Sequence, residues 1–200
     1  MRGQAMKRVC EKLGRHGYNM SDMDALEFFA REGDWQTKEY AGKVKTVEAW
    51  EVNPNFENGL KKNLPDAVIR IGNSFELARD DMNKGKFDFI IIDNPQCLYG
   101  PNNEYCEHFE ALELVPFLLK ERGIVMFNIN SNPFDYDKHP EWQKRRNEFY
   151  NLTDTSLLTK DFLLSFYKDF FKQMGLKIEF AWFESRNEQY LAYLIYGLHE

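Results

Sequence analysis

The sequence lacks a hydrophobic segment long enough to cross a membrane. An α-helix needs ~20 consecutive apolar residues to span a bilayer, and no apolar run in this chain of 200 residues approaches that length. The first residues, Met1 to Gln4, lead directly into a polar helical pattern and carry no apolar core of a signal peptide. We therefore expect a soluble cytoplasmic protein with no membrane partner.

Cysteine is also scarce, and acidic residues outnumber basic ones. The three cysteines, Cys10, Cys97 and Cys106, are an odd number at spacings that match neither a disulfide framework nor a zinc site. We therefore expect no metal. The formal net charge of −6 argues against a general nucleic-acid binder. The basic run 144–146 leaves contact with nucleic acid open as the less favoured alternative.

The sequence instead contains an alternation of helix-like and strand-like segments along its whole length, without internal repeats. Such alternation is typical of α/β folds built on a parallel sheet. The length suits one domain with its own hydrophobic core. We expect helices at about 5–13, 35–41, 54–63, 111–120 and 159–174 and one that begins near residue 74, with strands at 25–30, 44–52, 67–71, 87–92 and 123–129.

The last part of the chain departs from simple alternation. Residues 130–158 form a long polar and aromatic stretch, and loops of that length are usually functional covers or binding elements, or are disordered. Two further strand-like runs, 176–185 and 189–198, are joined by the short turn 186–188 and must therefore be antiparallel. The sequence predicts one domain over 1–200, with a parallel sheet that ends in an antiparallel hairpin and a cap-like insertion at about 130–158.

Two acidic residues stand at expected strand ends. Glu27 lies near the end of the first strand and Glu51 near the end of the second. In doubly wound α/β sheets, ligands bind at the carboxyl ends of the strands, and an acid at the tip of the second strand accepts hydrogen bonds from ribose hydroxyls. A charge in an apolar strand end also needs a partner to offset its desolvation. These positions predict a nucleoside-binding crevice.

With this pattern, the whole chain resembles the class I S-adenosylmethionine-dependent methyltransferases. That family has a Rossmann-like, three-layer sandwich whose seven-stranded, mostly parallel sheet ends in such a hairpin. The resemblance implies S-adenosyl-L-methionine as the cofactor. It implies that Glu27 is the acid of the first motif, that the loop after it, with Phe28, Phe29 and Gly33, surrounds the methionine part, and that Glu51 holds both ribose hydroxyls.

The resemblance places further residues at the cofactor. Val52 and Asn53 would border the adenine, Asn73 or Ser74 would approach its amino group, and Asp93 would line the space between cofactor and acceptor. The two asparagines also have a local interpretation, because each stands where a helix cap is expected. A capping role and a backbone contact with the cofactor are compatible.

The chain departs from the family in the loop after the first strand, which usually carries alternating glycines. Phe29 and Arg31 stand at the earlier glycine positions, and only Gly33 remains. Glycine allows the backbone to approach a ligand closely. The loop therefore either takes a wider path around the cofactor or no longer binds it. The second reading implies a catalytically inactive binding or regulatory protein.

The segment that begins at Asp93 resembles the Asp/Asn-Pro-Pro-aromatic signature of methyltransferases that act on amino nitrogens. The resemblance implies that Asp93, with Asn94, orients the acceptor. Asn94 replaces the first proline and Gln96 replaces the aromatic residue, so stacking on a flat acceptor would come from Tyr99 or Trp142. The alternative is a strand-ending loop without a catalytic role.

His108 is a further catalytic candidate, because a histidine can act as a general base near pH 7. A lone histidine at a helix start is more often a surface residue or a local hydrogen-bond partner.

The resemblance implies transfer of a methyl group to a nitrogen or oxygen of a small-molecule or other polar acceptor, with the insertion as its cover. Transfer of an aminopropyl group uses the same fold, but no residue favours it. The sequence determines neither the acceptor nor the oligomeric state. The aromatic residues of the final hairpin, including Trp182, Tyr190, Tyr193 and Tyr196, suit either a core or an interface.

Overall fold

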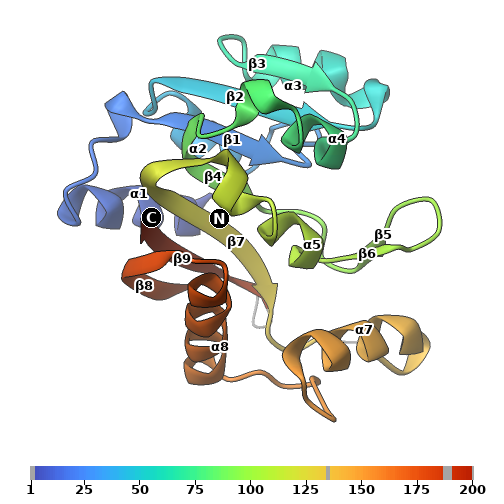
Figure 1. The fold of residues 1–200 in the computed structure, drawn as a ribbon. Coiled ribbons are helices and arrows are strands. Elements are labelled where there is room, and N and C mark those ends of the chain that lie inside the picture. Colours follow the sequence, from blue (N-terminus) through green and yellow to red (C-terminus); the bar gives the residue numbers. More distant parts are fainter. Residues whose placement is uncertain (1–2, 134–135, 187–190, 200) are drawn as a thin grey trace.

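A seven-stranded sheet forms the centre of the computed structural model, which describes residues 3–133, 136–186 and 191–199 (Figure 1). The strand order is β3-β2-β1-β4-β7-β9-β8. The strands of the sheet are β1 (Asp24–Phe28), β2 (Thr46–Glu51), β3 (Val68–Ile71), β4 (Phe87–Ile92), β7 (Leu119–Asn130), β8 (Lys177–Ser185) and β9 (Leu191–His199). Neighbours from β3 to β7 are parallel, and β9 is antiparallel to both β7 and β8. The mostly parallel sheet with a final antiparallel hairpin is confirmed.

Helices cover both faces of this sheet. They are α1 (Gln4–Arg15), α2 (Thr37–Ala41), α3 (Glu57–Asn63), α4 (Ser74–Ala78), α5 (Phe109–Leu112), α6 (Val115–Leu118), α7 (Pro140–Tyr150) and α8 (Lys160–Gln173), with 3₁₀ turns at Met20–Asp22, Pro54–Phe56, Asp81–Asn83 and Tyr136–Lys138. Residues of α1 and α2 belong to one buried cluster, and residues of α4, α5, α6, α7 and α8 belong to another. The sheet therefore lies between two helical layers.

The strand β4 lies at the centre of the sheet and is covered on both faces. Phe89 and Ile91 pack in the cluster that includes α1, whereas Ile90 and Ile92 pack in the cluster on the opposite face. Successive side chains of a strand point to opposite faces. Because both faces of β4 are covered, every one of these positions is apolar.

The expected helix at 111–120 is wrong in its extent. Two short helices, α5 and α6, occupy this region, and β7 already begins at Leu119. Pro116 stands in the first turn of α6. Proline suits the first turn of a helix but removes a hydrogen bond in its interior, so one continuous helix through this position is disfavoured.

The insertion at 130–158 contains a helix of 11 residues, contrary to the expected loop. Helix α7 lies beyond the tip of β7 (Figure 1). Its buried residues are Trp142, Arg146 and Tyr150, which recur every four positions on one face. The sequence did not reveal this helix because an arginine occupies the centre of its buried face, where an amphipathic pattern requires an apolar residue.

A small hairpin of β5 (Leu98–Tyr99) and β6 (Tyr105–Cys106) was also not predicted, since strands of two residues show no periodicity. In the final hairpin, Tyr193 and Tyr196 are fully buried and belong to the core. Most of the expected turn at 186–188, and Tyr190, lie outside the described residues. None of the described helices is long and apolar enough to cross a membrane.

A substitution at Gly123 tests the close packing of β7 against β4. A Cβ added at Gly123 would lie 2.7 Å from the carbonyl oxygen of Asp88 and 2.8 Å from Cδ1 of Leu119. We expect Gly123→Ala to lower the free energy of unfolding by about 1–3 kcal/mol, because the backbone must shift to relieve the overlap. Denaturant unfolding measures this change.

Gly14→Ala is the matched control for this prediction. Gly14 lies in α1, and its added Cβ would meet nothing within 4 Å. Alanine is favoured over glycine in a helix by roughly 0.5–1 kcal/mol, so this variant should be more stable than the parent. If both variants are stabilised, the close contact between β7 and β4 is wrong.

Candidate functional site

A cavity of about 700 Å³ opens at the carboxyl ends of β1, β2 and β4. β2 and β3 lie on one side of β1, whereas β4 and the later strands lie on the other. The chain thus reverses its direction of winding between β1 and β4. Open α/β sheets bind ligands at such a switch point.

Three carboxylates converge on this cavity, one from the end of each strand. Glu27 belongs to β1, Glu51 ends β2, and Asp93 directly follows β4. All three are buried and line the cavity. The structure thus brings together the acidic residues that the sequence placed at the site.

Backbone amides hold the Glu51 carboxylate in a defined orientation. Oε2 accepts a hydrogen bond from the amide of Arg31 at 2.7 Å, and Oε1 accepts one from the amide of Asn53 at 2.8 Å. Each carboxylate oxygen can accept a further bond. Glu51 therefore retains the capacity to bind two ligand hydroxyls while it fixes the loop after β1.

The loop after β1 has a left-handed backbone at alternate positions. Phe29, Arg31 and Gly33 have φ of 54°, 51° and 62°. Residues other than glycine rarely adopt this conformation. Aromatic contacts accompany it here, because the Phe29 ring lies 5.4 Å from that of Tyr99 and the Arg31 guanidinium lies 5.7 Å from the Phe56 ring centre. Phe29 and Arg31 therefore adopt a backbone conformation that usually requires glycine.

Some predicted cofactor residues do not line the cavity. Phe28 packs in the core, with its ring 5.1 Å from that of Trp50. The side chains of Asn53 and Asn73 each accept a hydrogen bond from the backbone amide two residues further on, as helix caps. Ser74 is buried at the start of α4. Local capping and core packing thus account for these positions.

Other predicted residues do line the cavity. Phe29, Gly33 and Val52 contribute to its wall, and Val52 is 63% exposed at the mouth. An exposed valine beside Glu51 provides an apolar surface next to a carboxylate. This combination suits a flat ring joined to a sugar.

Burial changes the protonation of Glu27. Its side chain is 2% exposed, and the Tyr40 hydroxyl donates a hydrogen bond to its carboxylate. Burial raises the pKa of Glu27 to about 8, opposed by the bond from Tyr40, while the charge of Asp93 adds to the rise and a bond from Thr37 opposes it. Glu27 is therefore largely protonated at neutral pH.

The cavity also contains a cation that the sequence did not indicate. Arg186 lines the cavity, and its Nη1 donates a hydrogen bond to Oδ1 of Asp93 at 2.9 Å. Both side chains are buried. The carbonyl oxygen of Asp93 accepts a further bond from the side chain of Asn128. The sequence placed Arg186 in a turn. Only the folded structure brings it to Asp93, with which it forms an ion pair.

His108, the further catalytic candidate, does not line this cavity. It is fully buried, and its Nε2 is hydrogen-bonded to the hydroxyl of Tyr167. Burial, together with the charge of Arg146, holds its pKa well below the usual range. Neutral His108 is a hydrogen-bonded core residue, and we do not propose a catalytic role for it.

The basic run 144–146 does not form a positive patch. Arg146 is buried in an ion pair with Glu107, and Arg145 forms an ion pair with Glu110. Lys144 is exposed. The basic run that left nucleic acid open as a partner thus has one side chain in the core and the others at or near the surface.

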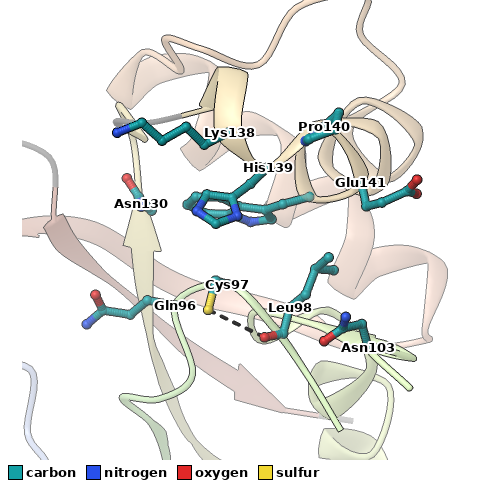
Figure 2. A pocket seen from close by; sticks show the side chains of 10 residues that line it. Gln96, Cys97, Leu98, Asn103, Asn130, Lys138, His139, Pro140 and Glu141 are labelled. Atoms are coloured by element: carbon teal, nitrogen blue, oxygen red, sulfur yellow. Dashed lines mark hydrogen bonds between the residues drawn. The ribbon is translucent and has the colours of Figure 1, made fainter. Parts of the chain in front are cut away.

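A second cavity, of about 470 Å³, adjoins the first. Gln96 lines both. Figure 2 shows the side chains of 138–141, from the end of the last 3₁₀ turn to the start of α7, on one side of the second cavity and those of 96–98 with Asn103 on the other. The insertion therefore forms one wall of a cavity next to a residue that also lines the larger one. Over the described part of the chain, no group of three or more metal-ligating side chains is placed to hold a metal ion.

No protein-family model matches the sequence, and no curated protein sequence matches it. Solved structures do match. TYW2 of M. jannaschii in complex with AdoMet has a TM-score of 0.54 and 16% identity, with 99% of this chain and 77% of that chain covered. A SAM-dependent methyltransferase from Leishmania major has a TM-score of 0.61 and 14% identity, with 98% and 72% covered. The trans-methyltransferase CalH in complex with SAH has a TM-score of 0.60 and 17% identity, with 96% and 55% covered.

These likenesses establish the architecture. The chain has the Rossmann-like fold of the class I S-adenosylmethionine-dependent methyltransferases. The sequence similarity is too low to carry more than the fold. Function must therefore be argued from the site.

We predict that Glu27 makes stability depend on pH. The folded protein holds the Glu27 proton up to a pKa of about 8, whereas the ordinary value is 4.5. The stabilising contribution is therefore complete below pH 4.5 and is lost as pH rises toward 8. Between these values, the melting temperature should fall by roughly 3–6 °C for each pH unit relative to Glu27→Gln, because one proton corresponds to about 1.4 kcal/mol per unit.

Thermal melts of the parent and Glu27→Gln at a series of pH values measure this difference. Glu76→Gln removes an exposed carboxylate outside both cavities and serves as the control. The melting temperature of this control should change with pH in the same way as that of the parent. If the melting temperature of Glu27→Gln also changes with pH as that of the parent does, Glu27 is ionised in the folded protein and the inferred pKa is wrong.

Proposed function

We propose that the protein binds S-adenosyl-L-methionine in the larger cavity and transfers its methyl group to a nitrogen or oxygen of a polar, small-molecule acceptor. The observation that carries this proposal is the convergence of Glu27, Glu51 and Asp93 from three adjacent strand ends. A nucleoside with a charged amino-acid tail offers hydroxyl and ammonium donors, whose hydrogen bonds both ionised and protonated carboxyl groups can accept.

The dimensions and chemistry of the cavity fit this cofactor. Its volume of about 700 Å³ lies within the usual range for small-molecule sites. Glu51 would hold the ribose hydroxyls, and Val52 would border the adenine. The loop after β1 and Glu27 would hold the methionine part. Two of the similar structures are described in complex with AdoMet and SAH, which supports the same ligand here.

The residues after β4 would position the acceptor. When bound, the cofactor supplies a methyl group: the acceptor lone pair forms the new bond to carbon, the carbon–sulfur bond breaks with its electron pair on sulfur, and the acceptor releases a proton. Displacement of this kind depends mainly on positioning. Arg186 holds the Asp93 carboxylate at the cavity wall, and Asn94 and Gln96 follow it along the same wall. We propose that the insertion covers the acceptor.

We predict that Glu51→Ala weakens the binding of S-adenosylhomocysteine at least tenfold. A hydrogen bond to a charged group contributes about 1.5–3 kcal/mol, and 1.4 kcal/mol corresponds to a factor of ten. Calorimetric titration measures the dissociation constant. Glu51→Gln should retain part of the affinity, because its amide oxygen still accepts hydrogen bonds.

Glu76→Gln again provides the control and should bind as the parent does. A folded Glu51→Ala variant with unchanged affinity would place the ribose elsewhere. If the parent protein gives neither heat nor thermal stabilisation with millimolar S-adenosylhomocysteine, the protein is the inactive binding or regulatory protein that its sequence left open.

We predict that Asp93→Asn lowers methyl transfer on the order of 100-fold while it changes cofactor affinity little, because misplaced acceptors react slowly. Asparagine keeps the shape of the side chain and leaves Arg186 a neutral partner. Complete removal would leave a buried, uncompensated charge and destabilise the fold. Asn94→Ala should give a smaller loss. Transfer of labelled methyl groups to a metabolite pool measures the rate, and wild-type turnover by Asp93→Asn would contradict the assignment.

A further inference from the structure

The second cavity has its own wall chemistry, and this chemistry indicates what kind of molecule it takes. It shares the lining residue Gln96 with the larger cavity, three residues after Asp93. A molecule that fills the second cavity therefore extends toward the proposed methyl-transfer point. The inference that follows rests on the proposed function.

A buried ion pair fixes the wall that α7 contributes. Arg146 and Glu107 are both fully buried and hydrogen-bonded to each other. Nη2 of Arg146 also donates to the carbonyl oxygen of Asn130 at 2.7 Å, and Nε1 of Trp142 donates to Glu107 at 2.9 Å. One network thus ties α7 to the tip of β7 and to the start of α5. The Trp142 ring is held in place before any ligand arrives.

The inner part of the cavity wall is uncharged. Asn130 and Trp142 are 5% and 6% exposed and line the cavity from β7 and α7. The charged side chains of the wall, Lys138 and Glu141, have opposite signs and are both exposed. A charged ligand that entered the inner part would lose hydration without gaining an opposite charge. An uncharged ligand avoids this cost.

Asn130 supplies the polar contact. Its Oδ1 is buried and has no hydrogen-bond partner among the described residues. A buried acceptor without a partner is costly, so a ligand N–H at this point would be favoured. Trp142 lines the same cavity with an aromatic ring, and aromatic rings favour flat partners that stack or meet their edges.

We infer that the second cavity binds the methyl acceptor, and that this acceptor is a flat, uncharged molecule with an N–H that donates to Oδ1 of Asn130. The Trp142 ring forms the apolar surface against which it lies. The reactive nitrogen or oxygen of the acceptor points past Gln96 toward Asp93. The insertion therefore determines acceptor specificity through a fixed wall.

Three probes of similar size separate the features of this acceptor. Benzamide is flat, is uncharged and carries an N–H. Benzoate is flat but charged, and cyclohexanecarboxamide carries the N–H but is not flat. Saturation-transfer NMR, with the protein saturated by S-adenosylhomocysteine, measures the dissociation constants. We expect millimolar binding of benzamide and at least fivefold weaker binding of the other two probes.

Asn130→Leu tests the hydrogen bond at similar side-chain volume. We expect it to weaken benzamide binding about fivefold, as one neutral hydrogen bond implies, and to leave the affinity for S-adenosylhomocysteine unchanged. Asn132→Leu is the matched control, because Asn132 is exposed and does not line the cavity. It should bind benzamide as the parent does.

The outcomes separate this inference from the proposed function. Equal or tighter binding of benzoate, no binding of benzamide, or unchanged benzamide affinity in Asn130→Leu would overturn the inferred acceptor class. Loss of S-adenosylhomocysteine binding in the variant would show that the substitution disturbs the fold, and Asn130→Ser then replaces it in the same comparison. If the parent does not bind S-adenosylhomocysteine, the proposed function fails, and the assignment of an acceptor fails with it.

Discussion

The site depends on how the protein compensates carboxylates that it buries at strand ends. An isolated charge in the interior is costly unless it is neutralised, paired or hydrogen-bonded. Each acid meets this requirement in a different way. Glu27 holds a proton, Glu51 accepts two backbone amides, and Asp93 pairs with Arg186. The surrounding loops take the paths that these interactions require.

These three solutions also give the acids different capacities for a ligand. Glu51 is held by two backbone amides and can still accept hydrogen bonds from hydroxyl donors. Asp93 shares its charge with Arg186, so it suits the positioning of an uncharged acceptor better than the capture of a cation. Protonated Glu27 can donate as well as accept a hydrogen bond. Three residues with similar side chains can therefore bind three different parts of a ligand.

The loop after β1 shows how one backbone conformation can arise from different residues. Glycine adopts a left-handed backbone without cost, whereas another residue needs roughly 1–3 kcal/mol from its surroundings. Phe29 and Arg31 each contact an aromatic ring, and the amide of Arg31 also binds Glu51. The loop is thus stabilised by packing on both sides of the backbone. Gly33 alone has no space for a side chain, since an added Cβ would lie 2.7 Å from Leu64.

The sequence by itself determined the order of the main elements and the strand ends that carry acids. Apolar runs and turn residues are local signals, and they suffice to identify β4, the final hairpin and the positions of Glu27, Glu51 and Asp93. The tertiary structure decided the partners of these residues. Arg186, Asn130 and Trp142 reach the two cavities from distant parts of the chain, and His108 turns into the core. The buried face of α7 depends on the ion pair between Arg146 and Glu107. These residues are 39 positions apart, so no local sequence pattern predicts their contact.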